Sequence, residues 1–268
     1  MNLHQLTLER KRHMDFIKFE TKGNIGIITL DRPGQNAFNY QMYKELRDTF
    51  DNINGSEDIW SVIIRAEGKY FSAGNDVSDF QAGVIDVSME EYGYMVEAGL
   101  GSVVNCRVPV ISAIQGIAVG SGFCIPTYSD IVIAAPEAKF GITEIKVGII
   151  GGAPEASFSL PPKIVRYMAL TGNLITAEEM VEHSFVLKVV PKGDLLDTAL
   201  GIAESIVRNP PIALKYMKAS LNNIYRPDII AKKVEFDGEK TGLHMQTEDF
   251  GEAVTAFMEK RDPEYKGK

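Results

Sequence analysis

Two glycine-containing loops are the places in this sequence where chemistry is most easily built. One is FSAGND, which follows the apolar run WSVIIRAE, and the other is AVGSGF, which follows PVISAIQG. Glycine lets the backbone adopt a positive φ or approach a ligand closely, and a helix that begins just after such a loop presents free N–H groups. Two loops that face each other would aim two backbone donors at one oxygen, as in an oxyanion hole. The same spacing also fits two ordinary turns at strand ends.

A cysteine, Cys124, stands directly behind the second loop, in the stretch GSGFCIP. A nucleophilic thiol needs a nearby base or positive charge. The surrounding GFCIPTY contains neither a histidine nor a basic residue, although a helix N-terminus also lowers a thiol pKa. The sequence therefore favours a small, packed side chain over a nucleophile.

The familiar catalytic and binding motifs are absent from the sequence. It contains no G-x-x-x-x-G-K-[ST], no H-E-x-x-H, no C-x-x-C and no G-x-S-x-G, and GSGFCI departs from G-x-G-x-x-G at its last position. The four histidines lie in polar contexts, so we expect no metal site.

Composition narrows the class of protein further. The 268 residues carry a net charge of −8 and a pI near 5.2, which argues against a nucleic-acid partner. Two cysteines suit a reducing cytoplasm. The first residues are mixed and charged rather than apolar like a signal peptide, and no window approaches 18 uninterrupted apolar residues. We therefore expect a cytoplasmic location and no membrane partner.

The elements that must position the two loops alternate between strands and helices. Strands are predicted over FIKFET, NIGIITL, WSVIIRAE, PVISAIQGIAVG, DIVIAAP and VLKVV, whereas FNYQMYKELRDTFDNI and EEYGYMVEAGLGSVVNC have helical patterns. From Pro154 onward, helical patterns dominate. The predicted fold class is α/β with a helical C-terminal region.

Taken together, five segments make the chain similar to the crotonase superfamily, the enoyl-CoA hydratase/isomerase family, over residues 15–264. They are IGIITLDRP, SVIIRAEGKYFSAGNDVSDF, PVISAIQGIAVGSGFCIPTYSDIVIAAPEAKFGITEIKVGI, LTGNLITAEE and AFMEKRDPEY. The resemblance implies a crotonase-like spiral of ββα units with an acyl-CoA site over residues 15–195, and a C-terminal helical oligomerisation region over residues 196–268. It also implies a homotrimer or hexamer, an acyl-CoA thioester substrate, and no cofactor besides the coenzyme A of that substrate.

The resemblance assigns roles to individual residues as well. In the family, two backbone N–H groups hold the thioester oxygen; they match Asn75 and Ser121 here. The implied contacts with coenzyme A are Gln35, Ala37, Ala73, Asp76, Val77, Gly122 and Lys260. The turn before Ala37 is one residue shorter than the usual family pattern. For Lys260, a solvated helix charge is a close alternative to a phosphate contact.

The pattern of carboxylates bears on which reaction is catalysed. Hydratases of the family carry two glutamates; here Cys124 occupies the first position and Glu144 the second. Addition of water works best with two carboxylates. Moving a double bond from C3 to C2 needs one base that takes a proton from C2 and returns it at C4. The sequence therefore favours a 3-enoyl-CoA isomerase that uses Glu144, with an enoyl-CoA hydratase as the alternative.

A further carboxylate, Glu155, lies in GGAPEASF, where hydratases of the family continue P-G-A-G-G-T-Q-R. It would suit a specialised hydrolase or lyase, or it is only a carboxylate favoured at a helix N-terminus. A catalytically silent acyl-CoA-binding subunit is another alternative, against which the retained Glu144 argues. Selection of the acyl group is expected to depend on variable segments such as residues 81–94.

Overall fold

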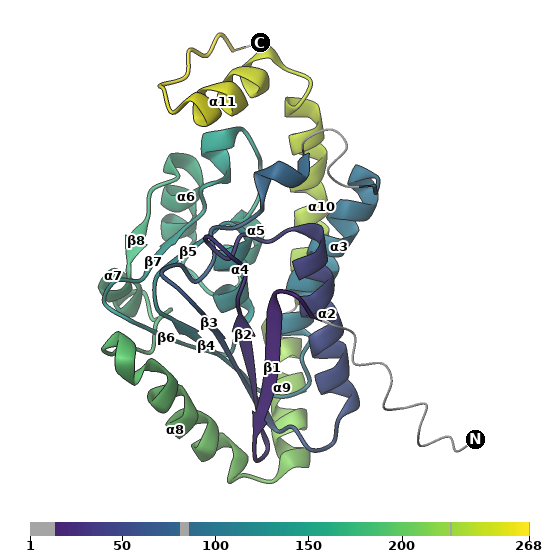
Figure 1. Cartoon of the computed structure of the whole chain (residues 1–268), viewed down its shortest axis with the longest axis vertical. Coiled ribbons are helices and arrows are strands. Elements are labelled where there is room, and N and C mark those ends of the chain that lie inside the picture. The colour runs from purple at the N-terminus through teal and green to yellow at the C-terminus, as the bar shows by residue number, and fades with distance from the viewer. Residues whose placement is uncertain (1–13, 81–85, 226, 268) are drawn as a thin grey trace, which may run out of the picture.

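A six-stranded sheet lies at the centre of the structure, a computed structural model that describes residues 14–80, 86–225 and 227–267 (Figure 1). Its strands follow the order β1-β2-β3-β4-β6-β9, and all neighbours are parallel except the hairpin of β1 and β2. The strands are β1 (Ile17–Lys22), β2 (Ile25–Leu30), β3 (Ser61–Ala66), β4 (Val110–Ile114), β6 (Ile131–Ala134) and β9 (Lys188–Val189). Residues 1–13, and residues 81–85 of the predicted acyl-selecting segment, lie outside the described residues.

Both faces of this sheet are covered by helices. In β3, Val62 and Ile64 join a core with α2 (Tyr40–Gly55) and α3 (Met89–Val104), whereas Ile63 joins a second core against α8 (Leu195–Val207). Figure 1 shows α2 and α3 on one side of the strands and α8 on the other. Because both faces are buried, the strands read in the sequence as continuous apolar runs instead of alternating ones.

A sharp corner at Gly116 divides the segment PVISAIQGIAVG between two sheets. The prediction of one strand there is wrong: β4 belongs to the central sheet, and β5 (Ile117–Val119) to a second sheet with β7 (Lys139–Gly141) and β8 (Ile175–Thr176). A Cβ atom at Gly116 would lie 1.9 Å from the carbonyl oxygen of Lys69. Only glycine allows this close approach, which brings the end of β5 beside the loop after β3.

The C-terminal part is helical, as predicted, and the α/β class with a helical C-terminal region is confirmed. One helix, α10, was not predicted; its sequence has Gly238 and Gly242 and little apolar periodicity. Within the described residues, no helix has the length and apolar character needed to cross a membrane. The remaining elements are η1 (Val77–Phe80), α4 (Ser121–Tyr128), η2 (Glu144–Val147), α5 (Ala153–Ala156), α6 (Pro162–Thr171), α7 (Ala177–Glu182), η3 (Lys192–Asp194), α9 (Pro211–Tyr225), α10 (Pro227–His244) and α11 (Glu248–Glu259).

A buried ion pair ties α9 to the central sheet. The Lys218 ammonium lies 2.7 Å from both carboxylate oxygens of Asp130, and the Lys218 side chain is 3% exposed. Asp130 also accepts a hydrogen bond from the backbone N–H of Val110, at the start of β4. Nearby, the amide of Asn222 donates to the carbonyl oxygen of Val104. The helical region is therefore joined to the core by polar groups that are mostly buried, with Lys218 3% and Asp130 22% exposed.

We predict that Lys218→Met lowers the free energy of unfolding by about 3 kcal/mol, because it leaves the Asp130 carboxylate without its charge partner. The matched control is Lys215→Met on the same helix, whose partner Glu57 is 80% exposed; it should cost less than about 1 kcal/mol. Urea unfolding of the three proteins measures both values. Equal losses of unfolding free energy in the two variants would show that the buried Lys218 pair stabilises the protein no more than the exposed Lys215 pair.

Candidate active site

The two glycine loops identified in the sequence are in direct backbone contact. A Cβ atom at Gly74 would lie 2.9 Å from the carbonyl oxygen of Val119 and 3.5 Å from the nitrogen of Ser121. Gly74 and Gly120 both have positive φ, +85° and +54°, a region that favours glycine. Behind them, a Cβ at Gly122 would lie 2.5 Å from the side chain of Ser72. The reading of these loops as unrelated strand-end turns is therefore wrong.

In this arrangement, the backbone N–H groups of Asn75 and Ser121 find no acceptor within the part of the chain that the structure describes. Asn75 forms a parallel bridge with Phe38, but its own N–H takes no part in it. The N–H of Phe38 donates to the carbonyl oxygen of Gly74, and the N–H of Asp76 donates to the carbonyl oxygen of Phe38. The N–H of Asn75 therefore points away from Phe38. Ser121 is the first residue of α4, so its N–H has no acceptor within the helix. Among the described residues, neither N–H has an acceptor, and both residues line one cavity.

Glu144, the first residue of η2, lies beside these donors. Its Oε1 is 3.1 Å from where a Cβ atom at Gly120 would be, and 3.3 Å from the same position at Gly152. A side chain at either glycine would crowd the carboxylate. The Oε2 atom is out of contact with solvent and has no hydrogen-bond partner among the described residues. Burial raises the pKa of Glu144 to about 7, and the nearby Glu155 adds to the shift.

Glu155 lines the same cavity from α5. The residue is 8% exposed, and its Oε2 also lacks a hydrogen-bond partner within the described part of the chain. Burial raises its pKa to about 7, with smaller contributions from Asp237 and Glu97. A carboxylate that only stabilised a helix N-terminus would be expected on the surface. Its burial in the cavity makes Glu155 a candidate for chemistry.

Cys124 is on α4 and lies within electrostatic reach of both glutamates. It is 3% exposed, and burial, followed by Glu155 and Glu144, raises the pKa of its thiol well above the usual value. The thiolate is the nucleophilic form, so this environment opposes nucleophilic chemistry and supports the packed thiol favoured by the sequence.

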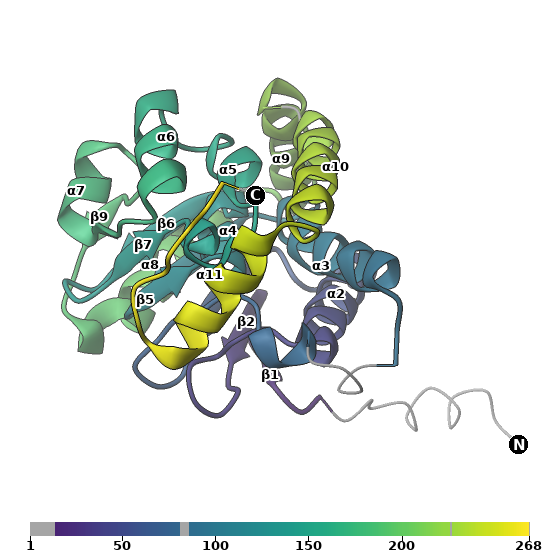
Figure 2. The same ribbon diagram turned by 90° about the horizontal axis from the view of Figure 1, so that it is seen from above.

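One cavity of about 1350 Å³ contains all five residues proposed for catalysis from the sequence. They are Asn75, Ser121, Cys124, Glu144 and Glu155. The walls are completed by side chains from α3, α10 and α11, and Figure 2 shows these helices grouped around α4. The cavity is larger than is usual for a small ligand, which leaves room for a long one.

Two of the predicted coenzyme A contacts, Ala37 and Asp76, are bonded to Arg32, a residue that the sequence analysis did not identify. Its guanidinium donates to the carbonyl oxygen of Ala37 at 2.8 Å and to the carboxylate of Asp76 at 2.6 Å. The N–H of Ala73 donates to the carbonyl oxygen of Gln35. The shortened turn and the first glycine loop are therefore joined. Of the predicted contacts, Val77 lines the cavity, whereas Gln35, Ala37, Ala73 and Asp76 are not among its lining residues.

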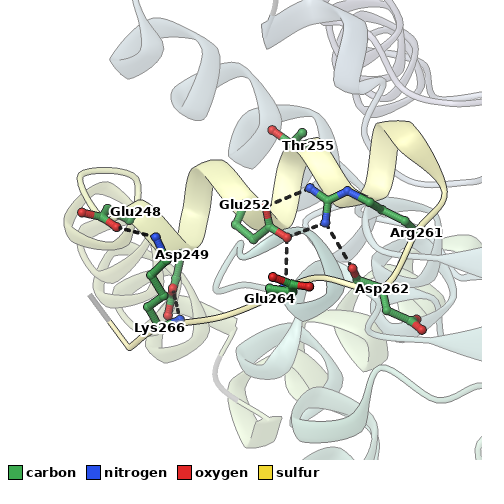
Figure 3. A pocket seen from close by; sticks show the side chains of 8 residues that line it. All are labelled: Glu248, Asp249, Glu252, Thr255, Arg261, Asp262, Glu264 and Lys266. Atoms are coloured by element: carbon green, nitrogen blue, oxygen red, sulfur yellow. Dashed lines mark hydrogen bonds and ion pairs between the residues drawn. The ribbon is translucent and has the colours of Figure 1, made fainter.

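Lys260 and Gly122 are not among the residues that line this cavity. Lys260 ends α11 in a left-handed conformation, φ +56°. The next residue, Arg261, helps to line a separate hollow of about 660 Å³, where Figure 3 shows its guanidinium facing Glu252. Lys266 pairs with Glu248 in the same hollow. The lining has five carboxyl side chains and two basic ones, and both basic side chains are already paired with carboxylates, so we assign no ligand to it.

Other side chains near the site had no recognisable signal in the sequence. Tyr43 lies in a helix that was predicted only from its apolar spacing, yet its hydroxyl reaches Ser121 and Asn75. Tyr128 is buried next to Glu155 and Cys124, and burial raises its pKa far above the usual value. Within the described residues, no group of three or more histidine, cysteine, aspartate or glutamate side chains is placed to hold a metal ion.

We predict that Glu155→Gln stabilises the protein at pH 8 and not at pH 4. With a pKa of about 7 in the folded state and about 4.3 when unfolded, this carboxyl makes stability fall as pH rises from 4.3 to 7. The loss is complete above pH 7, and replacing the Glu155 carboxyl should restore up to about 4 kcal/mol. Unfolding of both proteins at the two pH values measures the difference. Glu137→Gln, at an exposed position, should show no such pH-dependent gain.

Similarity to known proteins agrees with this geometry. A family profile described as enoyl-CoA hydratase/isomerase matches residues 20–268. Carnitinyl-CoA dehydratase of Escherichia coli strain K12 is 34% identical over 257 residues, which cover 92% of this chain and 96% of the relative.

Solved structures agree as well. The enoyl-CoA hydratase/isomerase of Pseudoalteromonas atlantica T6c superimposes with a TM-score of 0.85 at 25% identity, covering 94% of this chain and all of that one. The carnitinyl-CoA hydratase of Mycobacterium avium has a TM-score of 0.83 at 31% identity, covering 94% of this chain and 98% of that one. The crotonase-like fold expected from the sequence is confirmed, and this chain belongs to the enoyl-CoA hydratase/isomerase family of the crotonase superfamily.

Proposed function

We propose that the protein adds water reversibly across the C2–C3 double bond of a 2-enoyl-CoA, or removes it from the corresponding 3-hydroxyacyl-CoA. The observation that carries the proposal is the pair Glu144 and Glu155, two buried carboxyls that line one cavity and each have an oxygen without a hydrogen-bond partner among the described residues. Although Cys124 replaces the first family glutamate, Glu155 supplies a second carboxyl from another element. The dehydratase and hydratase names of the relatives support the same reaction class.

Each residue of the site has a separate role in the proposed hydration. The N–H groups of Asn75 and Ser121 hold the thioester oxygen, where negative charge develops, and such donors each contribute about 3–4 kcal/mol of transition-state stabilisation. Glu155, as a carboxylate, takes a proton from water while the water oxygen bonds to C3. Glu144, as a carboxylic acid beside Gly120, gives its proton to C2. Dehydration runs through the same steps in reverse.

The shifted pKa values suit this division of roles. Hydration requires one ionised and one protonated carboxyl, and two groups with pKa values of about 7 populate that state around neutral pH. Because the two groups interact, the macroscopic pKa values belong to the pair. Activity should therefore follow a bell-shaped pH profile with its maximum near pH 7.

The second candidate is the 3-enoyl-CoA isomerase that the sequence favoured. It is supported by the buried thiol of Cys124, which cannot replace a carboxylate in handling water. In that reaction Glu144 alone takes a proton from C2 and returns it at C4, and Glu155 has no chemical role. The two candidates therefore differ in whether Glu155 is required.

We predict that Glu155→Gln lowers kcat for hydration of crotonyl-CoA at least about hundredfold, the usual contribution of a general acid or base. Glu144→Gln should abolish both hydration and any conversion of 3-hexenoyl-CoA to 2-hexenoyl-CoA. Products are separated by chromatography, and Glu137→Gln serves as the control. If wild-type protein isomerises 3-hexenoyl-CoA without hydrating crotonyl-CoA, and Glu155→Gln does the same, the isomerase replaces the hydratase.

The charges of the cavity wall favour an acyl group with a cationic end. The described lining includes six carboxyl side chains against one basic side chain, Arg47, which is paired with Asp48. The acids are Asp51, Glu97, Glu144, Glu155, Glu235 and Asp237. One oxygen of Asp237 is buried without a partner among the described residues. The relatives are named for carnitinyl-CoA, whose acyl group bears a quaternary ammonium.

We predict that adding a trimethylammonium group at C4 of crotonyl-CoA raises kcat/KM at least about tenfold, equivalent to about 1.4 kcal/mol. Asp237→Asn should remove most of this preference and leave crotonyl-CoA turnover within about twofold. Glu239→Gln, on the same helix but outside the lining, is the matched control. A preference for the uncharged substrate in the wild type would rule out the cationic acyl group.

Self-association through the C-terminal helices is also proposed. Several large apolar side chains on α9 are exposed on the single chain, an arrangement typical of an interface. They are Ile212, Tyr216, Met217, Leu221 and Ile224. This surface supports the homotrimer or hexamer implied by the family resemblance.

A further inference from the structure

A buried hydrogen-bond network joins the side chains of the two residues whose N–H groups form the oxyanion hole. The Tyr43 hydroxyl lies within hydrogen-bond distance of both Ser121 Oγ, at 2.6 Å, and Asn75 Oδ1, and its single hydrogen is donated to one of these two oxygens. Ser121 Oγ donates to the same Asn75 Oδ1 at 3.2 Å. Three side chains from α2, from the first glycine loop and from the start of α4 therefore meet at one point.

Tyr43 is held rigidly at this point. Its side chain is fully buried, and its ring lies 5.0 Å from that of Phe38 and edge-on to that of Tyr92. Helix α3 packs against the Tyr43 backbone at Gly99, where a Cβ atom would lie 2.8 Å from the Tyr43 carbonyl oxygen. Burial also raises the pKa of the Tyr43 phenol well above the usual value, so it remains a neutral donor.

The hydrogen-bond network restrains the two loops at the point where their backbone is most flexible. The loop contact at Gly74 and Gly120 is between glycines, which restrict backbone conformation least of all residues. The close contacts of the Tyr43 hydroxyl with both neighbouring side chains limit how far residues 75 and 121 move apart. Misplacement of catalytic donors by a fraction of an ångström costs rate, because preorganised donors must already point at the developing charge.

We propose that Tyr43 is a positioning residue that sets the spacing of the two oxyanion-hole N–H groups through the side chains of Asn75 and Ser121. Tyr43 is absent from the cavity lining, so it acts through these two residues. This gives the side chains of Asn75 and Ser121 a purpose beyond the backbone role implied by the family resemblance. The inference rests on the oxyanion hole of the proposed function.

The test is Tyr43→Phe, which removes the hydroxyl and keeps the ring. We expect kcat to fall about tenfold or more, less than the loss of a whole donor, while KM changes less than about threefold. The direct readout is the absorbance of bound 4-dimethylaminocinnamoyl-CoA, which moves to longer wavelength as its thioester carbonyl is polarised. That shift should be smaller in Tyr43→Phe than in wild type. A purely structural role would lower stability without changing the shift.

Tyr40→Phe is the matched control, because Tyr40 is on the same helix and its hydroxyl bonds to Glu91 at 3.1 Å, outside the cavity. It should keep the wild-type kcat and absorbance shift. A wild-type shift and kcat in Tyr43→Phe would overturn the proposal.

If Tyr43→Phe does not fold, Asn75→Ala and Ser121→Ala take its place, since each keeps its backbone N–H and loses its bond to Tyr43. Both should show the reduced shift, and wild-type behaviour in both would overturn the proposal. No shift in the wild-type protein would instead overturn the oxyanion hole itself, and with it the proposed function.

Discussion

The site depends on one contact, the backbone approach of the loop after β3 to the end of β5. Glycines at 74 and 120 make this approach possible, and the corner at Gly116 directs the chain toward it. The contact places the N–H groups of Asn75 and Ser121 on one wall of a cavity, and the space at Gly120 also accommodates the carboxylate of Glu144. A methyl group at any of these three glycines would collide with a neighbour or crowd that carboxylate.

The carboxyls in the cavity are costly for the fold. Glu144 and Glu155 each have an oxygen that is removed from water and has no hydrogen-bond partner within the described chain. An unpaired buried polar group lowers stability, and the cost is greatest when the carboxyl is ionised. Groups of this kind are concentrated at functional sites, where shifted pKa values serve proton transfer. Their presence together argues for a site that catalyses a reaction rather than one that only binds an acyl-CoA.

Part of the site could be predicted because its signals are local in the sequence. The glycines of FSAGND and GSGF indicated the two loops, and the family resemblance of the segment TEIKVG indicated Glu144. The sequence favoured a packed Cys124 over a nucleophile because its neighbours include no base, and the burial of the thiol supports this interpretation. Glu155 was harder to interpret. A carboxylate near the start of a helix has the same local pattern whether it faces solvent or a cavity.

The sequence by itself determined the family, the α/β class and the positions of both loops, because residue order and local spacing carry those features. Only the tertiary structure decided which groups meet. Burial of Glu155 depends on α10, whose sequence lacks clear periodicity, and the bonds of Tyr43 join residues 32 and 78 positions apart. Likewise, one apolar run became two strands in different sheets because Gly116 passes against Lys69. Contacts between distant segments depend on three-dimensional packing, which local residue patterns do not encode.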